Sequence, residues 1–234
     1  MHLFPSEAWL DEYVRLLDES DALDDLSSGV GVAFDGTVHL VIADLPLATT
    51  AVGDLPEVAL EGLPAQVRES LADVPVADLP SLVDGHARAG LPEHARNLLH
   101  QIETNVVDGA LHVLLELDGG DCADAEVLTA PASRDPDFTV HGDYGTWRAI
   151  VDGRPPASAF LTGDLRVAGN RVRWLRHAAM FQLLGDVAGR VETTHLFERS
   201  SPSPGSLLVD EAVRHPAAVH RFVRRQTLRT LGLF

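Results

Sequence analysis

The chain has 234 residues, of which 45% are apolar and 6% aromatic, enough to build one sizeable hydrophobic core. Its 35 acidic residues outnumber its 18 basic residues and give a formal net charge of −17. Because a chain this acidic is repelled by a phosphate backbone, the composition argues against general nucleic-acid binding. The apolar residues come in regular blocks, which also argues against an intrinsically disordered chain.

All of the basic residues are arginine, and 22 aspartates stand against 13 glutamates. An Asp-rich, Lys-free composition is typical of cytoplasmic proteins that work in concentrated salt, where short carboxylates stay hydrated. An arginine-biased, GC-rich genome is the alternative explanation for the missing lysine. We therefore expect an acidic, halophilic protein, and the composition indicates its environment rather than its activity.

Signals for export or membrane insertion are missing from the sequence. Cys122 is the only cysteine, so an intrachain disulfide is excluded, in keeping with a reducing compartment. The N-terminus lacks a basic region followed by an apolar run, and no stretch approaches 18 uninterrupted apolar residues. We expect a cytoplasmic protein without a membrane span.

The first half of the chain predicts a helix, two strands and a helical region. Ser6 is predicted to cap the first helix, with Trp9 and Tyr13 on its apolar face. Strands over 29–34 and 37–43 are joined by an Asp-Gly pair, which favours a hairpin. Residues 46–105 are predicted to form a helical insertion, with helix starts at four Leu-Pro pairs at positions 55–56, 63–64, 79–80 and 91–92.

The second half predicts strands that precede helices. Strands are predicted over 110–117, 122–129, 138–142 and 164–168, helices over 144–151, 157–161 and 170–186, and an extended piece over 194–197. This order predicts an α+β fold with a mostly antiparallel sheet. The Ser- and Pro-rich residues 200–205 mark a linker, so we predict one domain over 1–200 and a C-terminal helical extension over 201–234.

No motif for nucleotide binding or catalysis is complete. Gly29 and Gly31 resemble the start of a dinucleotide loop, but the third glycine and the following helix are missing. The chain has neither a phosphate-binding Gly-Lys loop nor a Gly-x-Ser-x-Gly elbow. The spacing of His86, His94 and His100 does not place two of them one helical turn apart, as paired zinc ligands would require. We therefore predict no catalytic residue, no metal site and no cofactor.

Residues 138–197 carry the most informative motifs. A strand ending at Gly142 precedes a helix with Trp147, and the stretch TGDLRVAG (residues 162–169) precedes a long apolar helix. In this order the segments resemble the sterol carrier protein 2 (SCP-2) family of small lipid-transfer domains. The first helix and residues 115–127 resemble the opening helix and central hairpin of microbial members more loosely.

The resemblance implies a five-stranded, mainly antiparallel sheet covered by helices, with an apolar tunnel between sheet and helices. It implies a non-enzymatic carrier that binds or transfers a lipid or another long apolar ligand, such as a fatty-acyl or isoprenoid chain. The helical stretch 46–105 and the tail after residue 200 have no counterpart in the minimal domain. Met180 and Phe181 are the foremost candidates for ligand contact, and the full set of candidate lining residues is apolar: Trp147, Ile150, Phe160, Leu161, Leu165, Val167, Trp174, Leu175, Met180, Phe181 and Leu184.

Two other functions stay open from the sequence. A structural or regulatory module of the same fold would have a filled core and would oligomerise or bind a protein partner. An enzyme that acts on an acyl or isoprenoid chain would need polar groups that point into the tunnel, for which His141, His177 and Asp143 are the candidates.

The charge is divided unevenly along the chain. Residues 1–165 carry 7 arginines and 30 acidic residues, a net charge of −23, whereas residues 166–234 carry 11 arginines and 5 acidic residues, a net charge of +6. In the tail, Arg221, Arg224 and Arg225 share one face of a predicted amphipathic helix. This helix could contact an anionic membrane, the acidic surface of its own chain or a second copy.

Overall fold

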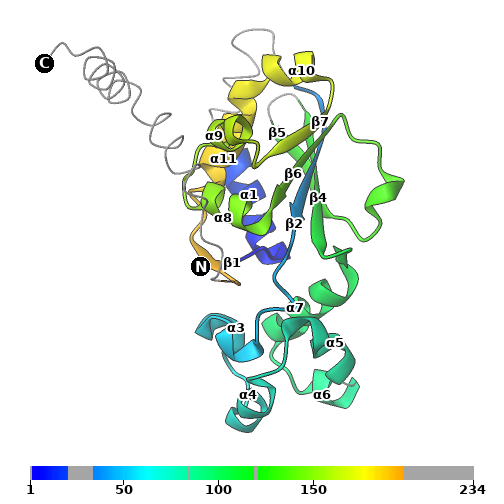
Figure 1. Ribbon diagram of the computed structural model, residues 1–234, viewed down its shortest axis with the longest axis vertical. Helices are drawn as coiled ribbons and strands as arrows, with labels where there is room; N and C mark the ends of the chain where they lie inside the picture. Colours follow the sequence, from blue (N-terminus) through cyan, green and yellow to red (C-terminus); the bar gives the residue numbers. More distant parts are fainter. Residues whose placement is uncertain (1, 21–33, 84, 119–120, 198–234) are drawn as a thin grey trace, which may run out of the picture.

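A mixed β-sheet lies at the centre of the computed structural model, which describes residues 2–20, 34–83, 85–118 and 121–197 (Figure 1). The sheet order is β3-β4-β2-β6-β7, and β5 pairs with the β4 edge that also carries β3. β2 and β6 run parallel, whereas the other pairs are antiparallel. The strands span β2 (Gly36–Ala43), β3 (Val106–Val107), β4 (Ala110–Asp118), β5 (Asp121–Val127), β6 (Phe138–Asp143) and β7 (Arg166–Gly169).

The expected number of five strands is corrected, because the sheet has six, and the sheet is mixed, with one parallel pair among mostly antiparallel ones. The chain between β2 and β6 runs through the helical region and three further strands, a connection long enough for parallel pairing. The predicted hairpin is wrong for β2, since β4 and β6 take both of its edges over residues 38–42. Residues 29–33 of its predicted partner strand lie outside the described residues.

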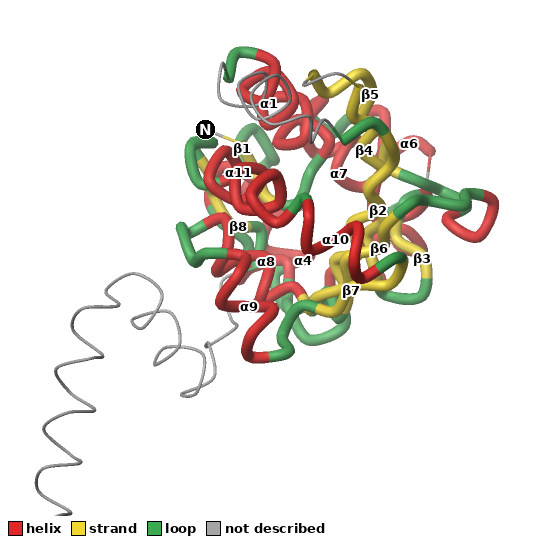
Figure 2. The backbone as a smooth tube through the Cα atoms, turned by 90° about the horizontal axis from the view of Figure 1, so that it is seen from above, coloured by secondary structure: helices red, strands yellow, loops and turns green. Residues whose placement is uncertain are grey.

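Helices cover one face of the sheet. In Figures 1 and 2, α1, α8, α9 and α11 lie on the same side of the strands, and α10 lies near the end where β7 ends. A separate parallel pair, β1 (His2–Phe4) and β8 (Thr193–His195), joins the first and last described segments. The helices span α1 (Glu7–Asp18), α8 (Tyr144–Val151), α9 (Pro156–Thr162), α10 (Arg171–Arg176) and α11 (Ala178–Ala188).

Local sequence signals explain several of these boundaries. The Ser6 hydroxyl accepts a hydrogen bond from the Trp9 amide and caps α1, as predicted. Asp143 caps α8 in the same way, and α8 has the predicted bounds. The helix predicted over 170–186 is instead two helices that meet at His177, whose backbone leaves the helical region. The break brings Trp174 of α10 onto Phe181 of α11, with ring centroids 3.4 Å apart.

Residues 52–104 form a helical region at one end of the molecule (Figure 1). Pro56, Pro64 and Pro92 are N-cap residues and Pro80 lies in the first turn of α5, so the predicted helix starts at the Leu-Pro pairs are confirmed. The helices span α3 (Glu57–Leu60), α4 (Ala65–Leu71), α5 (Leu79–Leu82), α6 (Gly85–Ala89) and α7 (Glu93–Thr104), with short 3₁₀ turns at Val52–Asp54 and Val76–Asp78. A third 3₁₀ turn, Pro131–Ser133, lies between β5 and β6.

Buried amides join this region to the rest of the molecule. The Gln101 side chain of α7 donates to the Pro5 carbonyl and accepts from the Glu7 amide at the start of α1. Asn105 donates to the Glu7 carboxylate, at 2.8 Å. The linker over 200–205 and the basic tail helix with Arg221, Arg224 and Arg225 lie outside the described residues. None of the described helices is long and apolar enough to cross a membrane.

Candidate functional site

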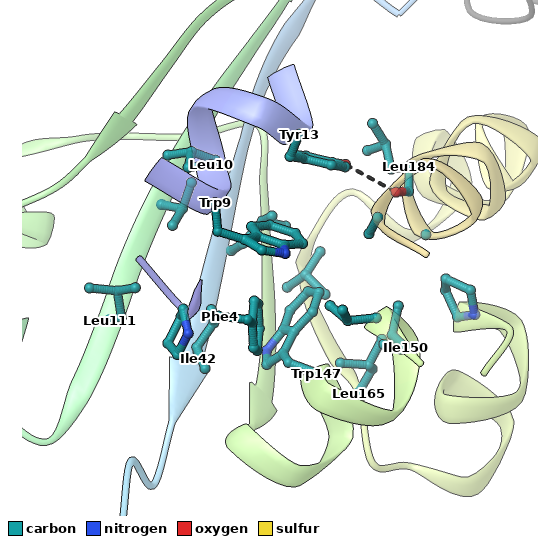
Figure 3. A pocket seen from close by; sticks show the side chains of 18 of the residues that line it. Phe4, Trp9, Leu10, Tyr13, Ile42, Leu111, Trp147, Ile150, Leu165 and Leu184 are labelled. Atoms are coloured by element: carbon teal, nitrogen blue, oxygen red, sulfur yellow. Dashed lines mark hydrogen bonds between the residues drawn. The ribbon is translucent and has the colours of Figure 1, made fainter. Parts of the chain in front are cut away.

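An apolar cavity lies between the sheet and the helices (Figure 3). It encloses about 820 Å³ of space free of protein atoms, open solvent at its mouth included. Leu40, Ile42, Leu111, Val113, Val127 and Val140 form its sheet wall. The opposite wall comes from β1, α1 and the helices after β6: Phe4, Pro5, Ser6, Trp9, Leu10, Tyr13, Trp147, Ile150, Val151, Pro156, Phe160, Leu165, Trp174, Phe181, Leu184, Gly185 and Ala188.

The sheet wall follows from the alternation of side chains along each strand. Leu40 pairs with Val113 on one side and Val140 on the other, so these three side chains share one face of the sheet. The residues between them point to the opposite face, where His39 approaches His112. A period of two along neighbouring strands therefore makes the cavity wall aliphatic.

The polar tips of three lining rings are bonded to protein groups. The Tyr13 hydroxyl donates to the Leu184 carbonyl at 3.1 Å, and burial raises the pKa of this phenol. The indole of Trp147 donates to the Val41 carbonyl, and that of Trp9 donates to the Thr193 hydroxyl, both at 2.8 Å. These bonds fix the orientation of the rings, and the walls present mainly carbon to the interior.

The TGDLRVAG stretch acts through a buried arginine outside the cavity. The Arg154 guanidinium, 5% exposed, donates to the Thr162 hydroxyl at 3.0 Å and to the Asp164 carboxylate at 2.8 Å. Partial burial opposes ionisation of Asp164, but the bonds from Thr162 and Arg154 keep its pKa below the usual value. This cluster ties the loop after α8 to the end of α9 and so positions Phe160 and Leu165, which do line the cavity.

Two glycines allow the close approach of the elements around the cavity. A Cβ at Gly142 would lie 2.6 Å from Leu165 Cδ2 and 3.1 Å from Trp147 Nε1. A Cβ at Gly185 of α11 would lie 2.2 Å from Pro156 Cγ at the start of α9. The separations of 2.6 Å and 2.2 Å are shorter than real Cβ contacts, so a larger residue at either position would force Leu165 or Pro156 to shift.

The predicted lining residues divide into two groups. Leu161 and Leu175 are 76% and 72% exposed and point away from the core, which corrects their assignment. Val167 is half-buried and Met180 is buried, but neither lines the cavity. The other seven do line it: Trp147, Ile150, Phe160, Leu165, Trp174, Phe181 and Leu184.

Sequence reasoning missed the contribution of the first 113 residues to the cavity. The sequence predicts Trp9 and Tyr13 on an apolar helix face and places Leu40 and Ile42 in a strand over 37–43. What the sequence did not show is that these elements face the helices that follow β6, more than a hundred residues later.

The three candidates for inward polar groups do not line the cavity. His141 and Asp143 are exposed, and the Asp143 carboxylate accepts from the Thr146 amide. His177 is buried against Phe34, with ring centroids 5.1 Å apart. Among the residues that the structure describes, no group of three His, Cys, Asp or Glu side chains is arranged to hold a metal ion.

A second apolar cavity, of about 580 Å³ with its open solvent, lies in the helical region. Its walls are aliphatic throughout and share no residue with the first cavity. They come from the 3₁₀ turns, from α3, α4, α5 and α7 with their connecting loops, and from the end of the described chain: Val52, Leu55, Ala59, Leu60, Leu63, Leu71, Val76, Leu79, Val83, Leu91, Ala95, Leu98, Leu99, Ile102 and Leu196.

The segment that supplies many of the residues of the first cavity is similar to a known protein family. Residues 75–181 match the model of the SCP-2 sterol transfer family. The matched segment is just under half of the chain and contains Trp147 and the TGDLRVAG stretch, so the resemblance to SCP-2 is confirmed for this segment. The match begins at Pro75, inside the region predicted as an insertion. It therefore does not support the prediction that all of 46–105 is inserted into the family's domain.

Two solved structures are similar to this chain. The first is the solution structure of the conserved hypothetical protein TT1886, possibly a sterol carrier protein, from Thermus thermophilus. It is 21% identical with a TM-score of 0.48, over 83% of this chain and 92% of that one. The crystal structure of sterol carrier protein 2 is 22% identical with a TM-score of 0.46, over 80% and 97% of the two chains. No curated protein matches the sequence.

Proposed function

We propose that the protein binds and carries a lipid or another long apolar ligand in the cavity between sheet and helices. The observation that carries this proposal is an aromatic-lined cavity in which three of the four ring donors are already bonded to protein groups. Transfer of a hydrocarbon chain from water gains about 25 cal/mol per Å² of buried apolar area and needs no catalytic group. Lipids are also the ligands that the name of the matched family implies.

The cavity supports this proposal over the two alternatives. A filled-core module would not need an apolar cavity whose walls come from both the sheet and the helices that cover it. An enzyme acting on the apolar chain would need polar groups inside, yet His141, His177 and Asp143 lie outside the lining. Binding without catalysis, and without a cofactor, is therefore the function we propose.

The remaining sequence-based expectations belong to the same proposal. The domain that binds the ligand spans residues 1–200, the helical region 46–105 is part of it, and residues 201–234 extend it. The Asp-rich, Lys-free composition supports a cytoplasmic carrier that works in concentrated salt. The sterol in the family name is one ligand among several that an apolar cavity accepts.

Lipid extraction and a cavity-filling variant test the proposal. Lipids extracted from the purified protein are identified by mass spectrometry, and uptake of a fluorescent fatty acid is titrated in high salt. Val113→Phe places a larger ring into the cavity from β4 and should lower the affinity for the fatty acid at least tenfold.

Leu114→Phe is the matched control for this variant. Leu114 is the next residue of β4, half-buried on the opposite face of the sheet, so its enlargement should leave the affinity unchanged. Circular dichroism establishes that both variants are folded. Absence of co-purified lipid together with absence of fatty-acid uptake would refute the proposal, as would equal effects of the two variants.

A further inference from the structure

One ring donor in the wall of the first cavity has no protein partner. Of the four lining rings that carry a polar hydrogen, those of Trp9, Tyr13 and Trp147 donate to protein groups, and the Ser6 hydroxyl of the lining caps α1. In the part of the chain that the structure describes, the fourth ring, the Trp174 indole of α10, has no hydrogen-bond acceptor. Trp174 is only 9% exposed, and a buried N–H needs an acceptor from the protein, from water or from a ligand.

Aromatic neighbours hold the Trp174 ring in place. It stacks on Phe181 with ring centroids 3.4 Å apart, and Phe160 and Phe138 pack edge to face with it at 4.9 and 5.4 Å. The break between α10 and α11 at His177 brings the ring into this position. Protein atoms do not seal off its N–H, so Trp174 offers a donor whose orientation is fixed before a ligand arrives.

Trp174 lies at one end of the cavity. Its ring packs on Phe138, the first residue of β6, at the end of the sheet where α10 lies in Figure 1. Trp147, whose N–H is already bonded, lies against Gly142 near the other end of that strand. Four residues of strand, about 13 Å, separate the two positions. A long ligand that lies along β6 therefore meets the Trp174 N–H with one end only.

The charge of the cavity wall restricts the group that this N–H can bind. Among the described residues that line the cavity there is no Asp, Glu, His or Arg. Arg173, the neighbour of Trp174 in α10, is bound by the Asp137 carboxylate and donates to the Asp35 carbonyl at 3.1 Å. A carboxylate buried beside Trp174 would lack a counter-charge, whereas an uncharged oxygen needs only one donor.

We propose that the Trp174 N–H binds an uncharged oxygen at one end of the ligand and so sets the orientation of the ligand in the cavity. The ligand class is a long-chain lipid with a terminal hydroxyl or carbonyl oxygen, whose hydrocarbon chain runs along β6. A free fatty acid makes the same apolar contacts but gains nothing from Trp174. This inference rests on the proposed function, because the ligand must first enter the cavity.

Displacement of the fluorescent fatty acid by dodecanol, dodecane and dodecanoate tests the role of Trp174. Trp174→Phe keeps an aromatic ring and removes the N–H. It should lower the affinity for dodecanol about fivefold more than it lowers the affinity for dodecane or dodecanoate. Phe181→Leu is the matched control, because it removes a lining ring without a donor and should weaken all three ligands by a similar factor. Circular dichroism establishes that both variants are folded.

Indole N–H signals in the NMR spectrum of the isotope-labelled full chain give a second measurement, which needs no stable variant beyond the assignment. The three tryptophans give three such signals, and Trp174→Phe assigns one of them by its loss. Dodecanol should shift the Trp174 signal, and dodecane should shift it less. The signals of Trp9 and Trp147 should move little with either ligand, since both N–H groups are already bonded.

The outcomes separate this inference from the carrier function. Equal losses of affinity for dodecanol and dodecane in Trp174→Phe, or a Trp174 signal that dodecanol does not shift, would overturn the role of Trp174 and leave the carrier function in place. A larger loss for dodecanoate than for dodecanol would make a carboxylate the bound group and overturn the uncharged oxygen. If the fluorescent fatty acid does not bind and none of the three ligands shifts an indole signal, the carrier function fails, and the role of Trp174 fails with it.

Discussion

The sheet-bearing half and the helical region both enclose an apolar cavity, but they build its walls differently. Around the first cavity, aromatic rings are tied by hydrogen bonds to backbone carbonyls and to a hydroxyl. Around the second, the walls are leucine, valine, alanine and isoleucine alone. The same contrast holds for burial, since α11 buries seven of its eleven residues whereas α4, α5 and α6 bury none.

This difference indicates which cavity keeps its shape. Aliphatic walls on short, half-buried helices can relax into an empty space, whereas rings fixed at their polar ends cannot do so without losing hydrogen bonds. An apolar lining therefore does not by itself make a ligand site, and the polar groups behind the wall decide whether the site is preformed. Substitution of polar groups behind the wall should therefore lower the free energy of unfolding more in the sheet-bearing half than comparable substitutions do in the helical region.

The largest effect is expected from Arg154→Met. This change leaves Asp164 and Thr162 without their buried donor and should lower the free energy of unfolding by about 3 kcal/mol. Arg88→Met in the helical region breaks the pair with Glu103, in which both side chains are at least one-third exposed, and should cost less than about 1 kcal/mol. Urea unfolding of both variants measures the difference, and equal losses would contradict the contrast between the two regions.

A smaller loss of stability is expected from Gly142→Ala, for which Gly85→Ala in the helical region is the comparison. Gly142→Ala forces Leu165 and Trp147 away from β6 and should cost about 1–3 kcal/mol. Because both displaced side chains line the cavity, the affinity for a fluorescent fatty acid should fall as well. Gly85→Ala in α6 meets nothing within 4 Å and should change stability by less than about 1 kcal/mol, in the stabilising direction. Thermal unfolding and fatty-acid titration of both variants measure these effects. An unchanged Gly142→Ala variant would contradict the close packing of Leu165 and Trp147 against β6.

Local signals in the sequence predicted much of the fold. The cap at Ser6, the helix starts at the Leu-Pro pairs and the bounds of α8 depend on neighbouring residues, and these predictions are confirmed. Seven lining residues could be found because they lie on a segment whose motifs resemble one family.

Non-local features could not be predicted in the same way. The parallel pairing of β2 with β6 joins residues about a hundred positions apart. The break at His177, which brings Trp174 onto Phe181, has no glycine or proline at or next to it that would have marked it in the sequence. Leu161 and Leu175 each follow an aromatic residue that does line the cavity, and the sequence pattern does not indicate which of the two neighbours is buried.

The smallest effect concerns histidines on the face of the sheet opposite the cavity. His39 Nε2 and His112 Nδ1 lie 3.1 Å apart, a contact that requires one ring to accept and so to be neutral at that nitrogen. Burial, reinforced by the neighbouring His112, lowers the pKa of His39. Burial also lowers the pKa of His112, despite a hydrogen bond to the Val107 backbone.

Acidification should therefore destabilise the protein through this pair. In the unfolded chain both histidines bind protons near pH 6.5, whereas the folded protein binds them only at lower pH. The stability that the neutral pair contributes is present above pH 6.5 and is lost as the pH falls through the lowered values. Urea midpoints between about pH 7.5 and 5.5 should decline less in a His39→Gln, His112→Gln variant than in the parent. His94→Gln, at an exposed position of α7, is the matched control from the helical region. If the urea midpoint of the double variant declined as much as that of the parent, the pH dependence would arise from other groups. The histidine pair would then not distinguish the sheet-bearing half from the helical region.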